Sequence, residues 1–257
     1  MLCMIKKKAS SHTPQSKKKT FPQESLQDNA SLIKFKNVTK FYNGGPAAID
    51  SVSLSIAPGE FVSVVGHSGA GKSTLLKMML AELYPSEGAV YLNQDNTQNL
   101  SKKEITRMRR SIGIIFQNFR LIDSKTVYEN IAFALEVAGM SNNEIEADVP
   151  HVLGLVDLHD KAEYFPRELS GGEQQRVAIA RAIVTQPDVL IADEPTGNLD
   201  PINTYEVVQI LKKINDLGTT VVLTTHNKGV VDSVGGRVIT MDAGKVVRDD
   251  TSGQYML

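Results

Sequence analysis

Eight consecutive residues have the types and spacing needed to hold the phosphates of a nucleotide. They run from Gly66 to Ser73 as Gly-His-Ser-Gly-Ala-Gly-Lys-Ser and fit the pattern G-x-x-x-x-G-K-[ST]. Glycines let backbone N–H groups turn around an anion, and the N-terminus of a following helix adds partial positive charge. Lys72 would reach the β- and γ-phosphates, and the Ser73 hydroxyl would hold Mg²⁺. We therefore predict that ATP is bound by Gly66, His67, Ser68, Gly69, Ala70, Gly71, Lys72, Ser73 and Thr74.

A pair of carboxylates follows a second apolar run. Val189–Ala192 has the composition of a buried strand and is followed by Asp193 and Glu194. Open α/β sheets bind ligands at the carboxyl ends of their strands. Asp193 suits the surroundings of Mg²⁺, and Glu194 suits a general base that orients the attacking water. Alone, such a strand end is usually only solvated, but the phosphate loop in the same chain favours the catalytic interpretation.

A third motif lies between these two. Leu169–Gln175 reads Leu-Ser-Gly-Gly-Glu-Gln-Gln, and Ser170 with Glu173 forms a capping-box pattern that predicts a helix over 174–184. A cap alone does not explain two adjacent glycines, which cost helix stability in a first turn. Glycines there do permit close approach of a phosphate to the helix N-terminus. We predict that Ser170, Gly171 and Gly172 contact nucleotide.

With these three motifs in this order, the chain resembles the ATP-binding cassette (ABC) ATPases over residues 32 to about 248. The resemblance implies an α/β fold: a P-loop NTPase with an antiparallel β lobe, a RecA-like core and a helical lobe at about 118–186. It implies that Tyr42 stacks on adenine and that Gln117 contacts Mg²⁺ and the attacking water. It also implies that Asp200 lies at the partner subunit and that His226 senses the γ-phosphate. Asn227 departs from the aspartate that is common beside this histidine.

The elements that must position these residues can be read from the pattern. Alternating strands are predicted at 32–42 and 49–56, around a turn at Asn43-Gly44-Gly45-Pro46. Helices are predicted through 127–138, where Thr126 and Glu129 fit a capping box, and through 144–156. The strands of the main sheet are expected at 61–65, 112–116, 189–193, 220–225 and 237–241.

Composition limits the classes of protein that remain. The 257 residues suit one ATPase domain at 31–257, and no apolar stretch approaches the ~18 residues that span a bilayer. The single cysteine excludes internal disulfides, and residues 1–30 lack the apolar core of a signal peptide. Residues 1–20 hold six lysines and no acid, which leaves 22 basic against 29 acidic residues and no sign of nucleic-acid binding. We predict a disordered basic tail at 1–30, either merely solvated or attracted to an anionic membrane surface.

Within the superfamily the chain resembles the FtsE family of cell-division ATPases. The resembling stretches are 66–77, Phe116–Ile122 and Thr126–Leu135. The resemblance implies a homodimer within a heterotetramer, with an FtsX-like integral membrane protein as partner, peripheral at the cytoplasmic membrane face, controlling cell-wall hydrolysis. An ATPase of lipoprotein release or macrolide export remains an alternative, as does, more remotely, a soluble ATPase of DNA maintenance or translation.

Overall fold

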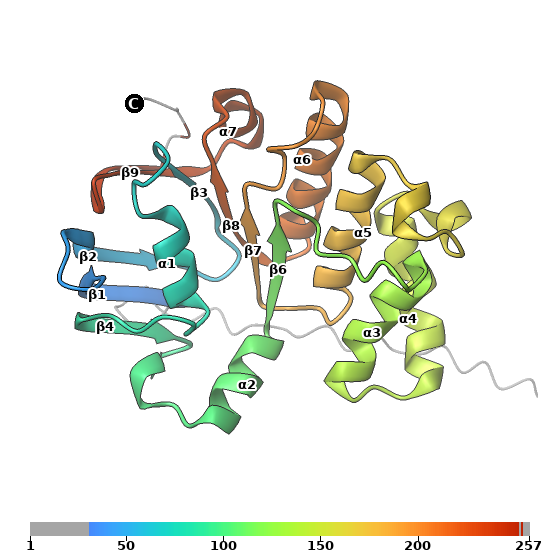
Figure 1. Ribbon diagram of the computed structural model, residues 1–257, viewed down its shortest axis with the longest axis horizontal. Coiled ribbons are helices and arrows are strands. Elements are labelled where there is room, and N and C mark those ends of the chain that lie inside the picture. Colours follow the sequence, from blue (N-terminus) through green and yellow to red (C-terminus); the bar gives the residue numbers. More distant parts are fainter. Residues whose placement is uncertain (1–30, 252, 254–257) are drawn as a thin grey trace, which may run out of the picture.

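The computed structural model describes residues 31–251 and 253, and the predicted basic tail at 1–30 lies outside the described residues. Two sheets organise this part of the chain (Figure 1). The antiparallel sheet has the order β2-β1-β4-β5 and consists of β1 Ile33–Phe41, β2 Ala47–Ile56, β4 Glu87–Leu92 and β5 Asp95–Asn96. The larger sheet has the order β10-β9-β3-β8-β7-β6 and consists of β3 Phe61–Val65, β6 Ile112–Phe116, β7 Val189–Asp193, β8 Thr220–Thr225, β9 Arg237–Asp242 and β10 Lys245–Asp250.

Helices cover both faces of the larger sheet. They are α1 Lys72–Met79, α2 Lys102–Arg110, α3 Val127–Ala138, α4 Asn142–Leu155, α5 Gly171–Ile183, α6 Pro201–Asp216 and α7 Lys228–Val234, with short 3₁₀ turns η1 Thr97–Asn99, η2 His159–Lys161 and η3 Pro166–Glu168. In Figure 1, α1 lies with the antiparallel sheet on one side of the central strands, and α3, α4 and α5 lie on the other.

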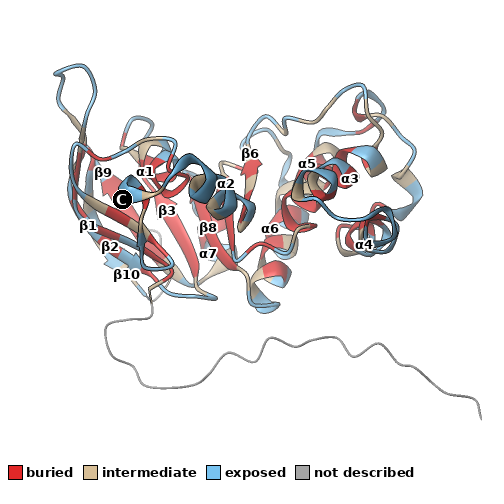
Figure 2. Cartoon of the chain, turned by 90° about the horizontal axis from the view of Figure 1, so that it is seen from below, coloured by how far each residue is buried: buried red, intermediate tan, exposed pale blue. Residues whose placement is uncertain are grey.

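The central strands are apolar because both of their faces are covered. All residues of β3 and β8 are buried, as expected for parallel strands between two layers (Figure 2). Side chains alternate between the layers: Leu190 and Ala192 join the core under the helical lobe, whereas Val189 and Ile191 join the core around α1. The sheet is therefore rigid at the strand ends from which the candidate site residues emerge.

The predicted fold class is confirmed, and several boundaries shift. The strands at 61–65, 112–116, 189–193 and 220–225 and the helix at 127–138 have the predicted bounds. The second strand begins at Ala47, two residues earlier than predicted. The helix of the Leu169–Gln175 motif begins at Gly171, three residues earlier than predicted; we call the motif the signature and this helix the signature helix. The signature helix starts early because Ser170 accepts a hydrogen bond from the Glu173 N–H and so caps residues that composition alone disfavours. The elements β4, β5, β10, α2, α6 and α7 were not predicted.

Candidate functional site

The phosphate loop connects β3 to α1 as predicted. Gly71 caps α1 with a φ of 106°, and Gly66 has a φ of 154°. A Cβ at Gly66 would lie 2.3 Å from the Met241 carbonyl oxygen, and one at Gly71 would lie 2.7 Å from the Ala48 carbonyl oxygen. Only glycine fits at either position without displacing β9 or β2. The tip of the loop, His67, Ser68 and Gly69, is exposed, and so is Ser73 on the first turn of α1.

Lys72 is buried beneath this loop and is held by the loop itself. Its Nζ donates hydrogen bonds to the carbonyl oxygens of Gly66 at 2.7 Å and His67 at 3.3 Å. The same Nζ lies 3.7 Å from Oε1 of Glu194. A cation at this position, at the N-terminus of α1 beneath a glycine-rich loop, is suited to bind an anion such as a phosphate.

The two predicted carboxylates emerge from the end of β7 beside β8. Thr224 of β8 pairs in register with Asp193, and its Oγ1 donates a hydrogen bond of 2.7 Å to Asp193 Oδ1. The Glu194 N–H donates to the Thr224 carbonyl oxygen and lies 3.1 Å from Thr224 Oγ1. Sequence analysis missed Thr224, although a threonine directly after the apolar run Val221–Leu223 was a signal that could have identified it.

Glu194 lies between Lys72 and His226, the histidine predicted to sense the γ-phosphate. It has a φ of 48°, an uncommon conformation for a residue with a side chain, and such strain is concentrated at functional sites. Its Oε2 lies 3.0 Å from Nδ1 of His226, close enough to accept a hydrogen bond from that nitrogen. Residues that follow β3, β7 and β8 therefore meet at one carboxylate, which is mostly buried while His226 is exposed.

Gln117 directly follows β6 and lies near the carboxylates of Asp193 and Glu194. Phe116 pairs in register with Asp193, so Gln117 leaves the sheet next to the carboxylates. A Cβ at Gly197 would lie 2.8 Å from Gln117 Nε2, and Asn198 Nδ2 donates to the Gln117 carbonyl oxygen at 3.3 Å. The hydroxyl of Ser73, the amide of Gln117 and the carboxylate of Asp193 offer the oxygen ligands that Mg²⁺ prefers, few enough for phosphate and water to complete its shell. No group of three or more His, Cys, Asp or Glu side chains suited to a metal occurs in the described part of the chain.

Tyr42 lies beside the phosphate loop, on the antiparallel lobe. Its hydroxyl is 3.4 Å from Thr74 Oγ1 of α1, and 43% of the residue is exposed. Lys40 Nζ lies 5.9 Å from the centre of its ring. An exposed aromatic face next to the predicted phosphate-binding loop is a suitable surface for a nucleotide base.

The signature residues form a separate surface at the start of α5. Ser170 and Glu173 form the predicted capping box, and hydrogen bonds from Ser170, first from its backbone N–H, hold the pKa of Glu173 below its ordinary value. Ser170 and Gly171 are exposed, whereas a Cβ at Gly172 would lie 1.7 Å from Asn203 Oδ1 of α6. Asp200 caps α6, and its pKa is lowered chiefly by the hydrogen bond from the Asn203 N–H.

The structure therefore brings most, but not all, predicted residues together. The phosphate loop, Tyr42, Gln117, Asp193, Glu194 and His226 share the carboxyl end of the large sheet. The signature at α5 lies across the molecule from α1, with β7, β8 and α6 between them in Figure 1. One chain thus presents two parts of a site that do not meet.

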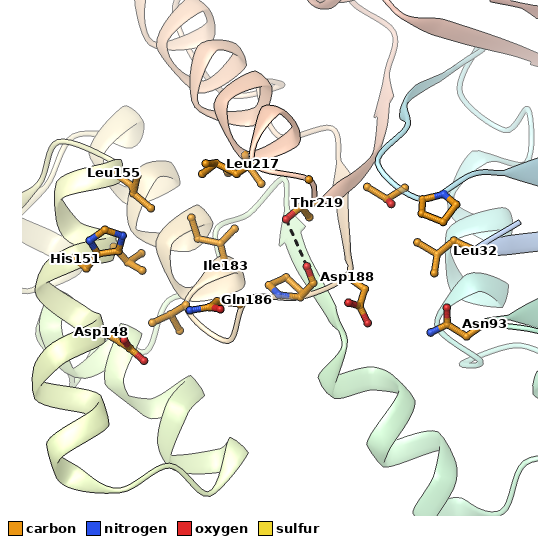
Figure 3. Close-up of a pocket in the computed structure, with 17 residues that line it drawn as sticks. Leu32, Asn93, Asp148, His151, Leu155, Ile183, Gln186, Asp188, Leu217 and Thr219 are labelled. Atoms are coloured by element: carbon orange, nitrogen blue, oxygen red, sulfur yellow. Dashed lines mark hydrogen bonds between the residues drawn. The ribbon is translucent and has the colours of Figure 1, made fainter. Parts of the chain in front are cut away.

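A cavity of about 880 Å³ lies at the opposite, amino end of the sheet (Figure 3). Leu32, Asp148, Ile183, Asp188 and Leu217 are among its lining residues, and Thr219 donates a 3.5 Å hydrogen bond to the Pro187 carbonyl oxygen across it. None of the residues predicted to bind nucleotide lines this cavity.

Comparison with known proteins agrees with this geometry. Residues 49–197 match the family described as ABC transporter. The chain is 51% identical over 224 residues to the cell division ATP-binding protein FtsE of Bacillus subtilis (strain 168), covering 87% of this chain and 98% of that protein. It is 45% identical over 222 residues to the methionine import ATP-binding protein MetN 3 of Oceanobacillus iheyensis, covering 85% of this chain and 65% of that protein. A dimeric structure of the ATP-binding cassette MJ0796, in a post-hydrolysis state with ADP and Pi, aligns with a TM-score of 0.77 at 40% identity, covering 85% of this chain and 98% of that one.

Proposed function

The chain belongs to the ABC transporter family of ATPases, and on that premise we propose that it is an FtsE-like subunit of a membrane complex. In this proposal it pairs with an FtsX-like integral membrane protein and uses ATP hydrolysis to control cell-wall hydrolysis in division. The identity to the Bacillus subtilis FtsE over nearly all of that protein supports the assignment. Identity to a methionine importer subunit is lower, at 45%, and makes an importer the competing assignment.

The observation that carries the enzymatic part is the contact of Glu194 with both Lys72 and His226. In our proposal Lys72 binds the β- and γ-phosphates while Glu194 accepts a proton from the attacking water. His226 and Gln117 orient that water and the γ-phosphate, and Tyr42 stacks on the adenine. Mg²⁺, held by Ser73, Gln117 and Asp193, would neutralise charge on the phosphates.

The signature supports a homodimer within a heterotetramer. Because Ser170 and Gly171 are exposed and lie away from the phosphate loop of their own chain, we assign them to the nucleotide of a second copy. Asp200, exposed at the start of α6 next to Gly172 and Asn203, would then lie at the same interface. Two-fold symmetry gives two equivalent composite sites.

A groove beside β6 supports docking of the membrane partner. Its volume is about 580 Å³, and it is formed by β6, which is the edge strand of the sheet, together with α2, α3 and α5. Ile122, Phe133 and Val137 give it an apolar surface, and its charged lining residues are all arginines: Arg109, Arg110 and Arg181. We assign it to a cytoplasmic helix of the FtsX-like protein that combines apolar and acidic residues. The helices of residues 31–251 include none with the length and apolar character of a membrane span, so this proposal leaves the membrane-spanning part to the partner.

Co-purification tests this function. Tagged full-length chain, solubilised with its native membranes in mild detergent, should retain an FtsX-like protein rather than the permease of an importer. Val137→Glu should reduce that recovery, because Val137 is 57% exposed in the groove. Val247→Glu is the matched control, since Val247 is 59% exposed on β10 at the far edge of the sheet. Recovery of an import permease, or equal loss in both variants, would contradict the proposal.

A further inference from the structure

The loop that follows Gln117 has an unusual backbone conformation, and a few side chains of other elements hold it in place. Phe119 and Arg120 have φ values of 53° and 50°, two consecutive residues with side chains in the left-handed region. Such a conformation persists only when surrounding groups stabilise it. The Arg120 side chain covers the Phe116 ring at 3.8 Å and so faces back toward β6.

The stabilising group comes from the signature helix. Arg181 of α5 donates from Nη1 to the Arg120 carbonyl oxygen at 2.7 Å and from Nη2 to the Phe119 carbonyl oxygen at 3.0 Å. Within the described residues no carboxylate lies within ion-pairing distance of Arg181, so two carbonyl groups compensate its charge. Burial lowers the pKa of this guanidinium, which shows that water solvates it poorly. A poorly solvated cation makes strong hydrogen bonds to carbonyl groups, so the loss of these hydrogen bonds is destabilising.

The other end of the loop is fixed to the same lobe. Asn130 of α3 is fully buried and donates from Nδ2 to the carbonyl oxygens of Ile122, Lys125 and Thr126. Its Oδ1 accepts from the Ile122 N–H at 2.8 Å. The loop is therefore attached to α3 and α5, whereas Gln117, which precedes it, lies against Gly197 after β7.

We propose that Arg181 is a positioning residue for ATP hydrolysis, fastening the Gln117 loop to the signature helix so that the two move as one unit. Arg181 also lines the docking groove, so a partner helix in the groove contacts the residue that holds this loop. The inference rests on the role proposed above for Gln117. Loss of Arg181 releases the Phe119 and Arg120 backbone from its left-handed conformation, and Gln117 then leaves its position beside Gly197.

The test measures the loop and the reaction separately in the full chain. Arg181→Met should raise amide hydrogen exchange across residues 118–122 by about tenfold or more, while exchange in β3 stays unchanged. It should lower kcat for Mg-ATP by about tenfold and leave KM within about twofold, because the phosphate loop is untouched. Arg181→Lys keeps the charge and N–H donors but not the planar fork of the guanidinium, so its effects should lie between those of the parent and Arg181→Met.

Matched variants separate this role from general destabilisation. Arg176→Met removes another arginine of α5, one whose guanidinium pairs with Glu206 of α6, and should leave exchange in the loop as in the parent. If Arg181→Met does not fold, Arg181→Lys carries both measurements. Unchanged loop exchange in the Arg181 variants overturns the tether, and a KM that rises as far as kcat falls overturns the positioning role. Full turnover in Gln117→Ala overturns instead the role of Gln117 on which the inference rests.

Discussion

The two halves of the nucleotide site differ in how far a single chain completes them. At the phosphate loop, Lys72 is buried and meets Glu194, which meets His226, so side chains from three strand ends already form one network. At the signature, Ser170 and Gly171 are exposed, and among residues 31–251 the Ser170 side chain is hydrogen-bonded only to Glu173 of its own capping box. The first half is a network of charged side chains, and the second is a capped helix end.

This difference indicates how ATP can act as a switch. The side chains around Lys72 need little further ordering when a phosphate binds, because they are already in position. In the homodimer that we propose, the signature half gains its ligand from a second chain. ATP would then contribute contacts to both chains and favour their association by its differential affinity for the closed pair.

The largest effect is expected in the phosphate-loop half. Glu194→Gln removes the carboxylate that we assign as general base, so ATP hydrolysis should slow by roughly 10²-fold or more while ATP binding persists. Phosphate release and calorimetric titration with Mg-ATP measure the two properties. Glu60→Gln is a control, because Glu60 pairs with Arg237 elsewhere on the core. Near-normal turnover in Glu194→Gln would remove Glu194 from the base role.

The next effect joins the two halves in one experiment. Lys72→Ala chains and Ser170→Arg chains should each be nearly inactive alone, since both sites of either homodimer are damaged. In a mixed dimer, both lesions fall in one composite site and the other site is intact. An equal mixture should recover up to about a quarter of the parent activity, since half of randomly formed dimers are mixed.

Mixed dimers must be shown to form by tagging the two variants differently and purifying with both tags. No recovery in that doubly purified sample would count against a signature that acts on the other chain, or would mean that both sites must be intact. A specific hydrolysis rate that does not depend on protein concentration, in a chain that stays monomeric, would remove the two-halves comparison altogether.

A smaller effect is expected at the edge of the phosphate-loop half. Tyr42→Ala should raise the Kd for ATP by a few-fold to tens of fold, because loss of base stacking costs about 1–3 kcal/mol. Its kcat should change little, since the ring lies beside Thr74 and not beside Glu194. Tyr164→Ala is the matched control, as Tyr164 is 40% exposed in the helical lobe. If both variants bind ATP as the parent does, another residue holds the adenine.

The two halves were also unequal in what the sequence could predict. Glycine spacing, a strand run and an acidic pair are local patterns, so the phosphate loop was predicted, and the strands at 61–65 and 189–193 were predicted with correct bounds. The link between Asp193 and Thr224 depends on β7 and β8 being neighbours in register, which no local pattern reveals. The elements β4, β5 and β10 have exposed or short segments without a strong period, and they pair with edges that β1, β4 and β9 offer. The hydrogen bonds from Arg181 to the loop join residues about sixty positions apart in the chain, so no local pattern predicted them.

The smallest effect tests whether the capping box of the signature is only a cap. Glu173→Ala removes the carboxylate that accepts from the Ser170 N–H and Oγ, and capping devices contribute about 1 kcal/mol or less. Because the pKa of Glu173 is lowered, its contribution to the free energy of unfolding is present above the ordinary value of about 4.5 and is lost as the pH falls through the folded pKa. The difference in unfolding free energy between Glu173→Ala and the parent, measured by denaturant unfolding, should therefore be present at pH 7. It should vanish once the pH falls below the folded pKa of Glu173.

Glu144→Ala provides the matched comparison, because Ser141 and Glu144 form the same capping box at the start of α4, and the Ser141 N–H likewise lowers the pKa of Glu144. Both variants should lose stability with the same dependence on pH. Only Glu173→Ala should also weaken the Mg-ATP-dependent dimer of a Glu194→Gln chain, measured by sedimentation, since it frees Ser170 from the conformation that the capping box holds. Equal dimerisation in the two variants would mean that this end of α5 needs no cap to bind phosphate. A weaker dimer in Glu173→Ala alone would show that the same four residues both begin the helix and prepare it for the nucleotide of the other chain.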